Sequence, residues 1–506
     1  MLLWFVIAYW IISVAIGLYA ATRVHNTRDF AVAGRNLPIY IVIATVFATW
    51  FGSEAVLGIP AKFLEGGLSN IIADPFGSSL CLVLVGVFFA VPLYRMNLLT
   101  IGDFYKKKYG RSVEMLTSLA IVISYLGWVG AQIVALGLVF NVVSDGEISK
   151  LAGMWIGAGT VMVYTLFGGM WAVAITDLLQ MTIIVIGLLL IGHDVSAQVG
   201  GVAAVVEHAA AAGKFHFFPD LNWRDMIAFT AALVTMMLGS IPQQDVFQRV
   251  QSSRTAKIAM WGAILGGVLY FMFTFVPIFL AYSATLIDPA MVAAKMEKDS
   301  QLILPTFVLQ HSSLVMQVLF FGALLSAIKS CASATLLAPS VSFSENIIKP
   351  MLKRRLTDAE QLRLMRVVTL VFTLLVTLYA IYSVTYAGSS IFEMVENAYQ
   401  VTLVMAFVPL TAGVFWKRAN TQGALVSIFC GLMVWLGTAI AGPKDPMIPA
   451  HFAGLLASIA GMVAGALLPS VIGKPLPQEP EHATLQHRAA SNTGHVSKRS
   501  LRHFRK

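Results

Sequence analysis

The sequence contains few charged residues. Only 12% of its 506 residues are Asp, Glu, Lys or Arg, whereas 58% are hydrophobic. A typical soluble domain carries a charged fraction of about 25%. Because roughly 20 apolar residues cross the hydrocarbon core of a bilayer, the chain has room for about a dozen spans and their loops. The composition therefore predicts an all-α integral membrane protein.

The sequence also lacks the motifs that most cofactor and nucleotide sites require. Its three cysteines, Cys81, Cys331 and Cys430, lie in apolar stretches too far apart for a metal motif. The histidines fall at the ends of predicted spans, in loops or near the C-terminus, whereas a haem needs axial side chains inside the bundle. No Walker or Rossmann pattern occurs, which argues against ATP-driven pumping. We expect neither an enzyme nor a cofactor.

Thirteen apolar segments are predicted to span the membrane. The first is expected to be retained, because it lacks the basic start and small-residue cleavage site of a signal peptide. Residues 1–471 are expected to form one transmembrane domain with its core at about 39–415, followed by a basic, disordered tail at 472–506. The predicted spans are 2–20, 39–60, 70–94, 114–140, 152–167, 172–193, 223–243, 258–283, 312–341, 367–387, 391–415, 421–441 and 450–470.

The distribution of the positive charges indicates the membrane topology. A formal net charge of +9 in a soluble chain suggests nucleic acid, but here Lys and Arg gather in alternate loops between spans. Cytoplasmic loops carry an excess of Lys and Arg, so the N-terminus is predicted outside and the C-terminus inside. We expect a multi-pass protein of the plasma (inner) membrane whose partners are the bilayer and a small solute, with no nucleic acid.

The second span is interrupted at membrane depth. In ATWFGSEAVLGIP, Gly52 and Ser53 break an apolar run, and Glu54 places a carboxylate inside it. A buried carboxylate is costly unless it is paired or wetted, and a broken helix is tolerated only inside protein or beside a cavity. This combination is typical of the midplane binding site of a secondary transporter.

The seventh span carries a matching interruption. It breaks at Gly239-Ser240-Ile241-Pro242, followed by Gln243, Gln244 and Asp245. If spans 2–6 and 7–11 are two five-helix repeats, the odd number of helices gives them opposite topology. In YTLFGGMWAVAITDLLQ, Gly168-Gly169 is predicted to turn tightly between spans 5 and 6, and Asp177 lies about two turns into span 6. Asp177 is either a functional intramembrane acid or a helix-end residue that reaches water.

Four stretches resemble the sodium:solute symporter family, which includes bacterial proline and galactose carriers and animal sodium–glucose carriers. They are ATWFGSEAVLGIP in span 2, YTLFGGMWAVAITDLLQ across spans 5 and 6, QQDVFQR after span 7 and SAIKSCASATLLAPS in span 9. With FVPLTAGVFWKRANTQGAL, the resemblance covers essentially all thirteen spans. It implies a leucine-transporter core of two inverted five-helix repeats, framed by spans 1, 12 and 13, and sodium-coupled uptake of a small organic solute by alternating access.

The resemblance also implies a sodium site between spans 2 and 9. Its ligands here are the carbonyl groups of Ala48, Phe51 and Ala327 and the side chains of Ser330 and Cys331, with Asp177 as the nearby acid. The chemistry is consistent, because sodium takes oxygen ligands and a helix break frees carbonyl groups. Positions 327, 330 and 331 share one helix face.

Two residues of span 9 depart from the family pattern. Cys331 offers a soft sulfur where relatives offer a hydroxyl. Lys329 replaces an apolar residue near mid-membrane. It is either a modulator of coupling that pairs with Asp177 at the ion site, or a structural residue that pairs with another carboxylate or extends its ammonium group to the membrane interface. An ideal helix aims residue 329 roughly 150° away from the 327/330/331 face, which favours the second alternative. Sodium coupling, proton coupling and uncoupled transport remain open.

Four residues are candidates for solute binding. By the resemblance, Glu54 and Gln243 face the solute, and span 11, which opens with Glu393, completes the cavity. Trp50 offers a ring for stacking or for a cation–π contact. Glu393 is equally well explained as a carboxylate at a helix N-terminus. An acid-rich cavity favours an ammonium or a hydroxylated solute. The alternative function is a sensory membrane module without coupled transport.

Overall fold

The computed structural model describes residues 2–352, 354–443 and 446–469, so the predicted tail at 472–506 lies outside the described residues. The described chain is helical, and it contains no strand, only an isolated bridge between Leu37 and Ser253. Ten helices are long and apolar enough to cross a membrane, and two further pairs are spans bent at a break. With the apolar helix Lys150–Val163, these correspond to the thirteen predicted spans.

The spans follow one another in the order of the prediction. They are α1 (Leu2–Ala21), α3 (Ile39–Trp50) with α4 (Ile59–Gly66), α5 (Ser78–Leu84) with α6 (Ala90–Arg95), α8 (Arg111–Val143), α9 (Lys150–Gln198, two spans), α11 (Trp223–Gly239) with α12 (Gln244–Ser252), α13 (Ala256–Ile287), α16 (Leu314–Ser342), α18 (Asp358–Tyr382), α19 (Ile391–Thr402) with α20 (Val408–Phe415), α21 (Thr421–Ala441) and α22 (Ala450–Leu467). Shorter helices are α2 (Thr27–Val32), α7 (Ile101–Tyr109), α10 (Val202–Ala211), α14 (Pro289–Lys298), α15 (Ile303–His311) and α17 (Lys349–Met351).

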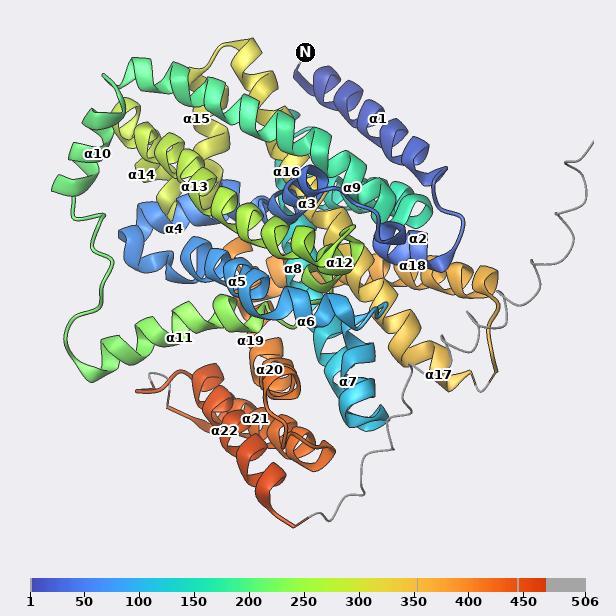
Figure 1. Ribbon diagram of the computed structural model, residues 1–506. Coiled ribbons are helices and arrows are strands. Elements are labelled where there is room, and N and C mark those ends of the chain that lie inside the picture. The colour runs from blue at the N-terminus through green and yellow to red at the C-terminus, as the bar shows by residue number, and fades with distance from the viewer. Residues whose placement is uncertain (1, 353, 444–445, 470–506) are drawn as a thin grey trace, which may run out of the picture.

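The peripheral spans frame a packed core. Figure 1 shows α21 and α22 side by side at one edge, and α1 against α9 at the opposite edge. Between them, α16 packs on both α8 and α9, and α3 packs on α9 and α13. Glycines permit close contacts: a Cβ at Gly127 of α8 would meet the Met394 carbonyl oxygen of α19 at 2.5 Å. Such small-residue contacts are typical of membrane helix packing.

The predicted break in span 2 is confirmed. Helix α3 ends at Trp50, Phe51 takes a non-helical conformation with φ −82° and ψ 72°, and the helix resumes as a π-helical turn at Glu54–Gly58 before α4. The two halves are bent by 57°. The Gln132 side chain of α8 accepts from the Ser53 amide at 2.9 Å, so a neighbouring helix satisfies a donor that the break frees.

Span 7 breaks where predicted, but its predicted end at residue 243 is wrong. Helices α11 and α12 meet at an angle of 45°, and α12 continues to Ser252. The QQDVFQR stretch therefore forms the second half of the span. Its polar sequence resembles a loop, yet all nine residues of α12 are buried, because this short helix packs inside the protein against α3, α13 and α16.

The turn expected at Gly168-Gly169 is a kink within α9. Gly169 has φ +48°, and a Cβ there would meet the Phe30 carbonyl oxygen of α2 at 2.5 Å. Both the backbone conformation and the close approach require glycine. The kink directs the second half of α9, which carries Asp177, along α3 and α16.

A histidine–carboxylate pair closes the loop between α13 and α16. His311 Nε2 lies 2.9 Å from Asp288 Oδ2, linking the ends of α15 and α13. The Met291 amide donates to Asp288 Oδ1 at 2.9 Å. These two hydrogen bonds, the Met291 amide first and His311 second, hold the pKa of Asp288 below its ordinary value of 3.8.

Candidate ion and solute site

Asp177 joins three helices at the centre of the core. Its side chain is fully buried in α9. Ser330 of α16 donates its hydroxyl to Oδ1 at 2.5 Å, and Thr45 of α3 donates its hydroxyl to Oδ2. A carboxylate removed from water must be matched by such donors or by a cation. Asp177 is therefore an intramembrane acid rather than a helix-end residue that reaches water.

The break in span 2 frees a carbonyl group beside this carboxylate. In a continuous helix the Gly52 amide donates to Ala48, but here it donates to the Trp50 carbonyl at 3.0 Å. The Ala48 carbonyl thereby loses its usual partner. Phe51, whose carbonyl is the second predicted ligand of α3, is the non-helical residue itself.

The predicted ligands of span 9 face the same break. Ala327, Ser330 and Cys331 are all fully buried in α16. A Cβ at Gly52 would meet Cys331 Sγ at 2.8 Å, so the sulfur packs directly against the break. The structure thus places Cys331 of α16 against the break in span 2 and joins the neighbouring Ser330 to Asp177 by a hydrogen bond.

Lys329 points to a different neighbour. Its Nζ lies 5.8 Å from the ring centroid of Tyr9 and 5.9 Å from that of Trp10, both on α1. Tyr9 also shares a hydrogen bond of 2.5 Å with Ser326, one turn earlier on α16. The pairing of Lys329 with Asp177, one of the two alternatives left by the sequence, is not formed between these two described side chains. The ammonium instead ties α16 to α1.

Glu54 lies on the second half of span 2 and faces α8. Gln132 donates to Oε2 at 2.8 Å, and the Trp128 indole N–H lies 3.3 Å from Oε1. The residue is only 2% exposed. These two donors fix the direction of the carboxylate. No sequence pattern singles out Trp128 or Gln132, because both lie in an uninterrupted apolar span.

Three aromatic rings meet beside this carboxylate. The centroid distances are 5.6 Å between Trp50 and Trp128, 5.4 Å between Trp128 and Tyr399, and 6.1 Å between Trp50 and Tyr399. We call Trp50, Trp128 and Tyr399 the aromatic cluster. Its members come from α3, α8 and α19, and the Tyr125 ring stacks on Trp128 at 5.9 Å. Only Trp50 was predicted, because the others become neighbours through the fold.

Gln243 caps the second half of span 7 inside the same region. Its Nε2 donates to the Ser124 hydroxyl of α8 at 2.9 Å, and the Thr402 hydroxyl of α19 lies 3.3 Å away. Tyr125, on the next residue of α8, donates to Asp245 Oδ1 at 2.5 Å. Gln243 therefore lies beside the aromatic cluster and holds the break in span 7 against α8 and α19.

Two further buried charges were missed by the sequence analysis. Arg249 of α12 donates to the Thr49 hydroxyl of α3 at 2.7 Å and is the charged neighbour that acts most strongly on Asp177. Asp74, which accepts from the Tyr270 hydroxyl at 2.6 Å, is the charged neighbour of Glu54. The signal for Arg249 was present in QQDVFQR, but assigning this stretch to a loop hid it.

Glu393 lies apart from the aromatic cluster. It forms a capping box with Ser390 at the N-terminus of α19 and an ion pair of 3.3 Å with Lys62 of α4. Its side chain is 46% exposed. The alternative given by the sequence, a carboxylate at a helix N-terminus, is the arrangement that the structure shows.

Comparison with known proteins identifies the family of the chain. The model of the sodium:solute symporter family matches residues 30–431. The chain belongs to the sodium:solute symporter family. It is accordingly a secondary active transporter of the membrane and not an enzyme, and the family gives no support to the sensory alternative.

Several curated relatives are similar over most of the symporter. The human high affinity choline transporter 1 is 27% identical over 456 residues, covering 85% of this chain and 75% of that protein. The osmoregulated proline transporter OpuE of Bacillus subtilis is 24% identical over 492 residues, covering 92% and 94%. The high-affinity proline transporter PutP of the same organism is 25% identical over 476 residues, covering 87% and 93%.

Solved structures show the same fold. A sodium-coupled sialic acid symporter in a substrate-bound outward-open state superposes with a TM-score of 0.77 at 21% identity, covering 92% of this chain and 97% of that one. The nucleobase-cation-symport transporter Mhp1 superposes with a TM-score of 0.55 at 14% identity, covering 89% and 98%. The predicted leucine-transporter architecture is confirmed.

Proposed function

We propose that this symporter couples sodium entry to the uptake of a small solute that carries a substituted ammonium group. The observation that carries the proposal is the buried Glu54 carboxylate beside the aromatic cluster. Aromatic faces attract cations, and quaternary ammonium groups are held by several rings at once. A carboxylate next to such rings adds the opposite charge that a cation needs when it leaves water.

The surrounding charges favour a cationic group over an anionic one. Glu54 and Asp74 are both buried, and Asp74 acts electrostatically on Glu54. The partners of Glu54 are the neutral donors Gln132 and Trp128. A solute with only a carboxylate would meet repulsion from both acids. Choline and proline, which appear in the names of three relatives, both carry a substituted ammonium group.

The proposed sodium ligands are the carbonyl groups of Ala48, Phe51 and Ala327 and the hydroxyl of Ser330. These are hard oxygen donors, as sodium prefers. Ser330 donates its proton to Asp177, which leaves its lone pairs directed elsewhere. Asp177 supplies the negative charge.

Cys331 completes the same face, but its sulfur is a weak ligand for a hard ion. We assign it to packing against Gly52, where the sulfur lies. Lys329 is proposed to modulate coupling indirectly, because its ammonium holds α16 to α1 while the adjacent Ser330 faces the ion.

The mechanism follows from the shared break. An ion bound between α3 and α16 fixes the first half of span 2, whereas Glu54 on the second half faces the solute. Solute and ion therefore act on the two sides of the same hinge, Phe51 to Ser53. Rearrangement of this hinge opens the site to one face of the membrane at a time. With the predicted orientation, the N-terminus lies outside and the C-terminus in the cytoplasm of an inner-membrane protein.

The proposal is tested by uptake into proteoliposomes with and without an inward sodium gradient. The labelled solutes are choline, proline and, as the contrasting class, a simple monocarboxylate. We expect sodium-driven accumulation of an ammonium solute, lost in Glu54→Gln and in Trp50→Ala. The matched controls are Glu297→Gln in α14 and Trp155→Phe on the exposed face of α9.

Two results would contradict this assignment. One is sodium-driven accumulation of the monocarboxylate that excess choline and proline do not inhibit. The other is undiminished uptake of an ammonium solute by both Glu54→Gln and Trp50→Ala, which would place the solute elsewhere in the protein.

A further inference from the structure

A large apolar cavity opens on the side of the protein, away from the ion and solute site. Its volume is about 510 Å³, and it lies between α4, α9, α10 and α13. Twelve of its fifteen lining residues have no polar atom in the side chain; the exceptions are His193, Ser196 and Tyr282. An apolar cavity of ~150 Å³ already holds benzene, so this one accommodates a much longer hydrocarbon.

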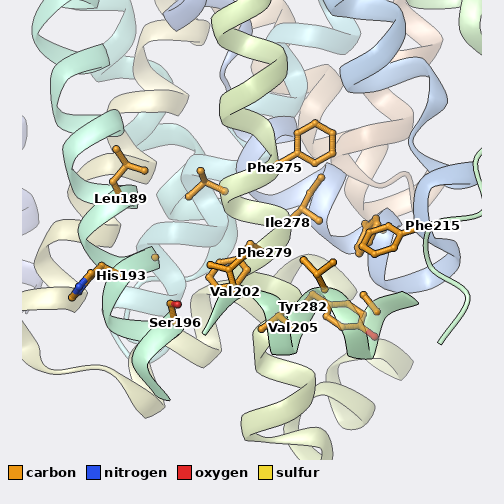
Figure 2. Close-up of a pocket in the computed structure, with 15 residues that line it drawn as sticks. Leu189, His193, Ser196, Val202, Val205, Phe215, Phe275, Ile278, Phe279 and Tyr282 are labelled. Carbon is orange, nitrogen blue, oxygen red and sulfur yellow. The ribbon is translucent and has the colours of Figure 1, made fainter. Parts of the chain in front are cut away.

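The cavity has an apolar end and a polar end. Figure 2 shows Leu189 and Phe275 at one end and His193, Ser196 and Tyr282 at the other. The polar end lies close to the ends of two spans, because α9 finishes at Gln198 and α13 at Ile287. Spans end where hydrocarbon gives way to headgroups. The polarity of the cavity therefore follows the depth of the bilayer.

The cavity is open towards the region that lipid occupies. Leu189 of α9 and Val202 and Val206 of α10 line it and remain 51%, 55% and 45% exposed. Helix α10 is not a span but a short apolar helix between spans 6 and 7. It covers the cavity next to α13, as a helix lying in the membrane interface does.

The lining does not suit the transported solute. No Asp or Glu lines the cavity, so an ammonium group there would lack a counter-charge. An anionic solute would find only the ring of His193 and two hydroxyl groups. A hydrocarbon chain carries no polar group that would be buried unsatisfied against the twelve apolar residues. A polar head attached to this chain would lie at His193 and Ser196.

One wall of the cavity belongs to the hinged span. Phe63 of α4 lines it, with ring centroids 6.4 Å from Phe215 and 5.9 Å from Tyr282. The neighbouring Lys214 donates its ammonium to the Leu64 carbonyl at 2.7 Å. Helix α4 continues the segment that carries Glu54. Whatever fills the cavity therefore contacts the half of span 2 that follows the break.

We propose that this cavity binds one acyl chain of a membrane phospholipid, with the headgroup at the His193–Ser196–Tyr282 end, and that the bound chain sets the position of α4. Binding of the lipid stands independently of the transported solute. The effect of the lipid on uptake rests on the proposed function, because a bound lipid changes the transport rate only if α4 moves during transport.

The binding is tested with a phosphatidylcholine that carries a photoactivatable diazirine near the end of one acyl chain. Protein in liposomes containing this lipid is irradiated, digested and analysed by mass spectrometry. We expect labelling of the α9 and α13 walls, within 189–196 and 275–282. Gly192→Phe fills the cavity from α9 and Val206→Trp fills it from α10, and both are expected to lose this labelling.

The matched control is Gly159→Phe on the same helix α9. A Cβ at Gly159 meets nothing within 4 Å, and this glycine is outside the cavity. It is expected to keep the wild-type labelling. Equal labelling in all four proteins would identify ordinary surface lipid and overturn the proposal, as would displacement of the label by excess choline or proline. Thermal unfolding of each variant verifies that it is folded.

The effect on transport is measured separately. Uptake by wild type and Gly159→Phe is expected to change with the acyl-chain length of the liposome lipid, whereas uptake by Gly192→Phe is not. Uptake by Gly192→Phe that depends on acyl-chain length as strongly as uptake by wild type contradicts the coupling to α4. If labelling behaves as expected but none of the tested solutes is taken up, the lipid site stands and the proposed function fails.

Discussion

Replacing Ser330 with alanine tests the ion site most directly. The hydroxyl is fully buried, donates to Asp177 at 2.5 Å and offers its lone pairs to the proposed sodium. Alanine removes the ligand and the donor while leaving the α16 backbone and the Ala327 carbonyl in place. We therefore expect a higher sodium concentration for half-maximal uptake, with little change in the solute concentration required at saturating sodium.

The size of this shift can be bounded from the contacts. Hydrogen bonds to charged groups contribute about 1.5–3 kcal/mol, and ~1.4 kcal/mol corresponds to a factor of ten in an equilibrium constant. The Ser330–Asp177 hydrogen bond is not itself a contact with the ion, so part of its contribution cancels between the free and bound states. We expect a rise of about tenfold, the lower end of that range. Asp177→Asn removes the charge itself and is expected to have the larger effect.

The assay is initial uptake of the labelled solute into proteoliposomes over a series of external sodium concentrations. Ser340→Ala is the matched control, because this buried hydroxyl of α16 donates to the Leu336 carbonyl of its own helix at 2.8 Å. A normal sodium requirement in both Ser330→Ala and Asp177→Asn would refute the proposed ion site, whatever the solute.

Three further predictions address other parts of the chain. Lys329→Met is expected to keep sodium-dependent uptake but to lower the melting temperature, because the ammonium group lies against α1. If uptake by wild type is independent of sodium and uptake by the mutant depends on it, the lysine replaces the ion. Gly169→Ala is expected to lower the free energy of unfolding by more than ~1 kcal/mol, because φ is +48° and the new Cβ would meet Phe30. The control Gly159→Ala is expected to be tolerated, because its Cβ has open space. Equal melting temperatures of the two variants would contradict this prediction. The depressed pKa of Asp288 stabilises the fold above the unfolded-state pKa of about 3.9, and this contribution disappears as pH falls through the folded-state pKa. Asp288→Asn is thus expected to lower the melting temperature near neutral pH, with the difference shrinking towards pH ~3; a difference independent of pH would contradict the sign.

The sequence predicted the fold well because its strongest signals are local. Apolar runs of membrane length mark the spans, and breaks such as Phe51–Ser53 carry their own glycine and polar residues. Helix α12 was assigned to a loop because Gln244 to Ser252 is polar, and polarity signals exposure when sequence alone is considered. Burial of that helix depends on α3, α13 and α16 surrounding it, which no local pattern records.

The candidate site likewise contains residues that the sequence predicts and residues that only the fold brings together. Asp177, Ser330 and the Ala48 carbonyl were predicted because each stands in a recognisable motif; the structure joins Asp177 to Ser330 and frees the Ala48 carbonyl at the break. Trp128 and Tyr399 belong to spans 4 and 11 and show no signal of their own, since an aromatic residue in an apolar span is usually a packing residue. Only the contacts among three helices turn them into part of a binding surface.

The proposed ion contacts and solute contacts differ in kind, and this difference affects specificity within the family. The proposed ion ligands are largely backbone carbonyl groups at a break, so their chemistry changes little when side chains change. The proposed solute contacts are side chains: Glu54, the aromatic cluster and Gln243. Glu54 is directed by Gln132, and Gln132 also caps the broken backbone at Ser53. One amide therefore connects the carboxylate proposed to face the solute with the break in span 2 beside the proposed ion site, and this gives a direct physical route for coupling.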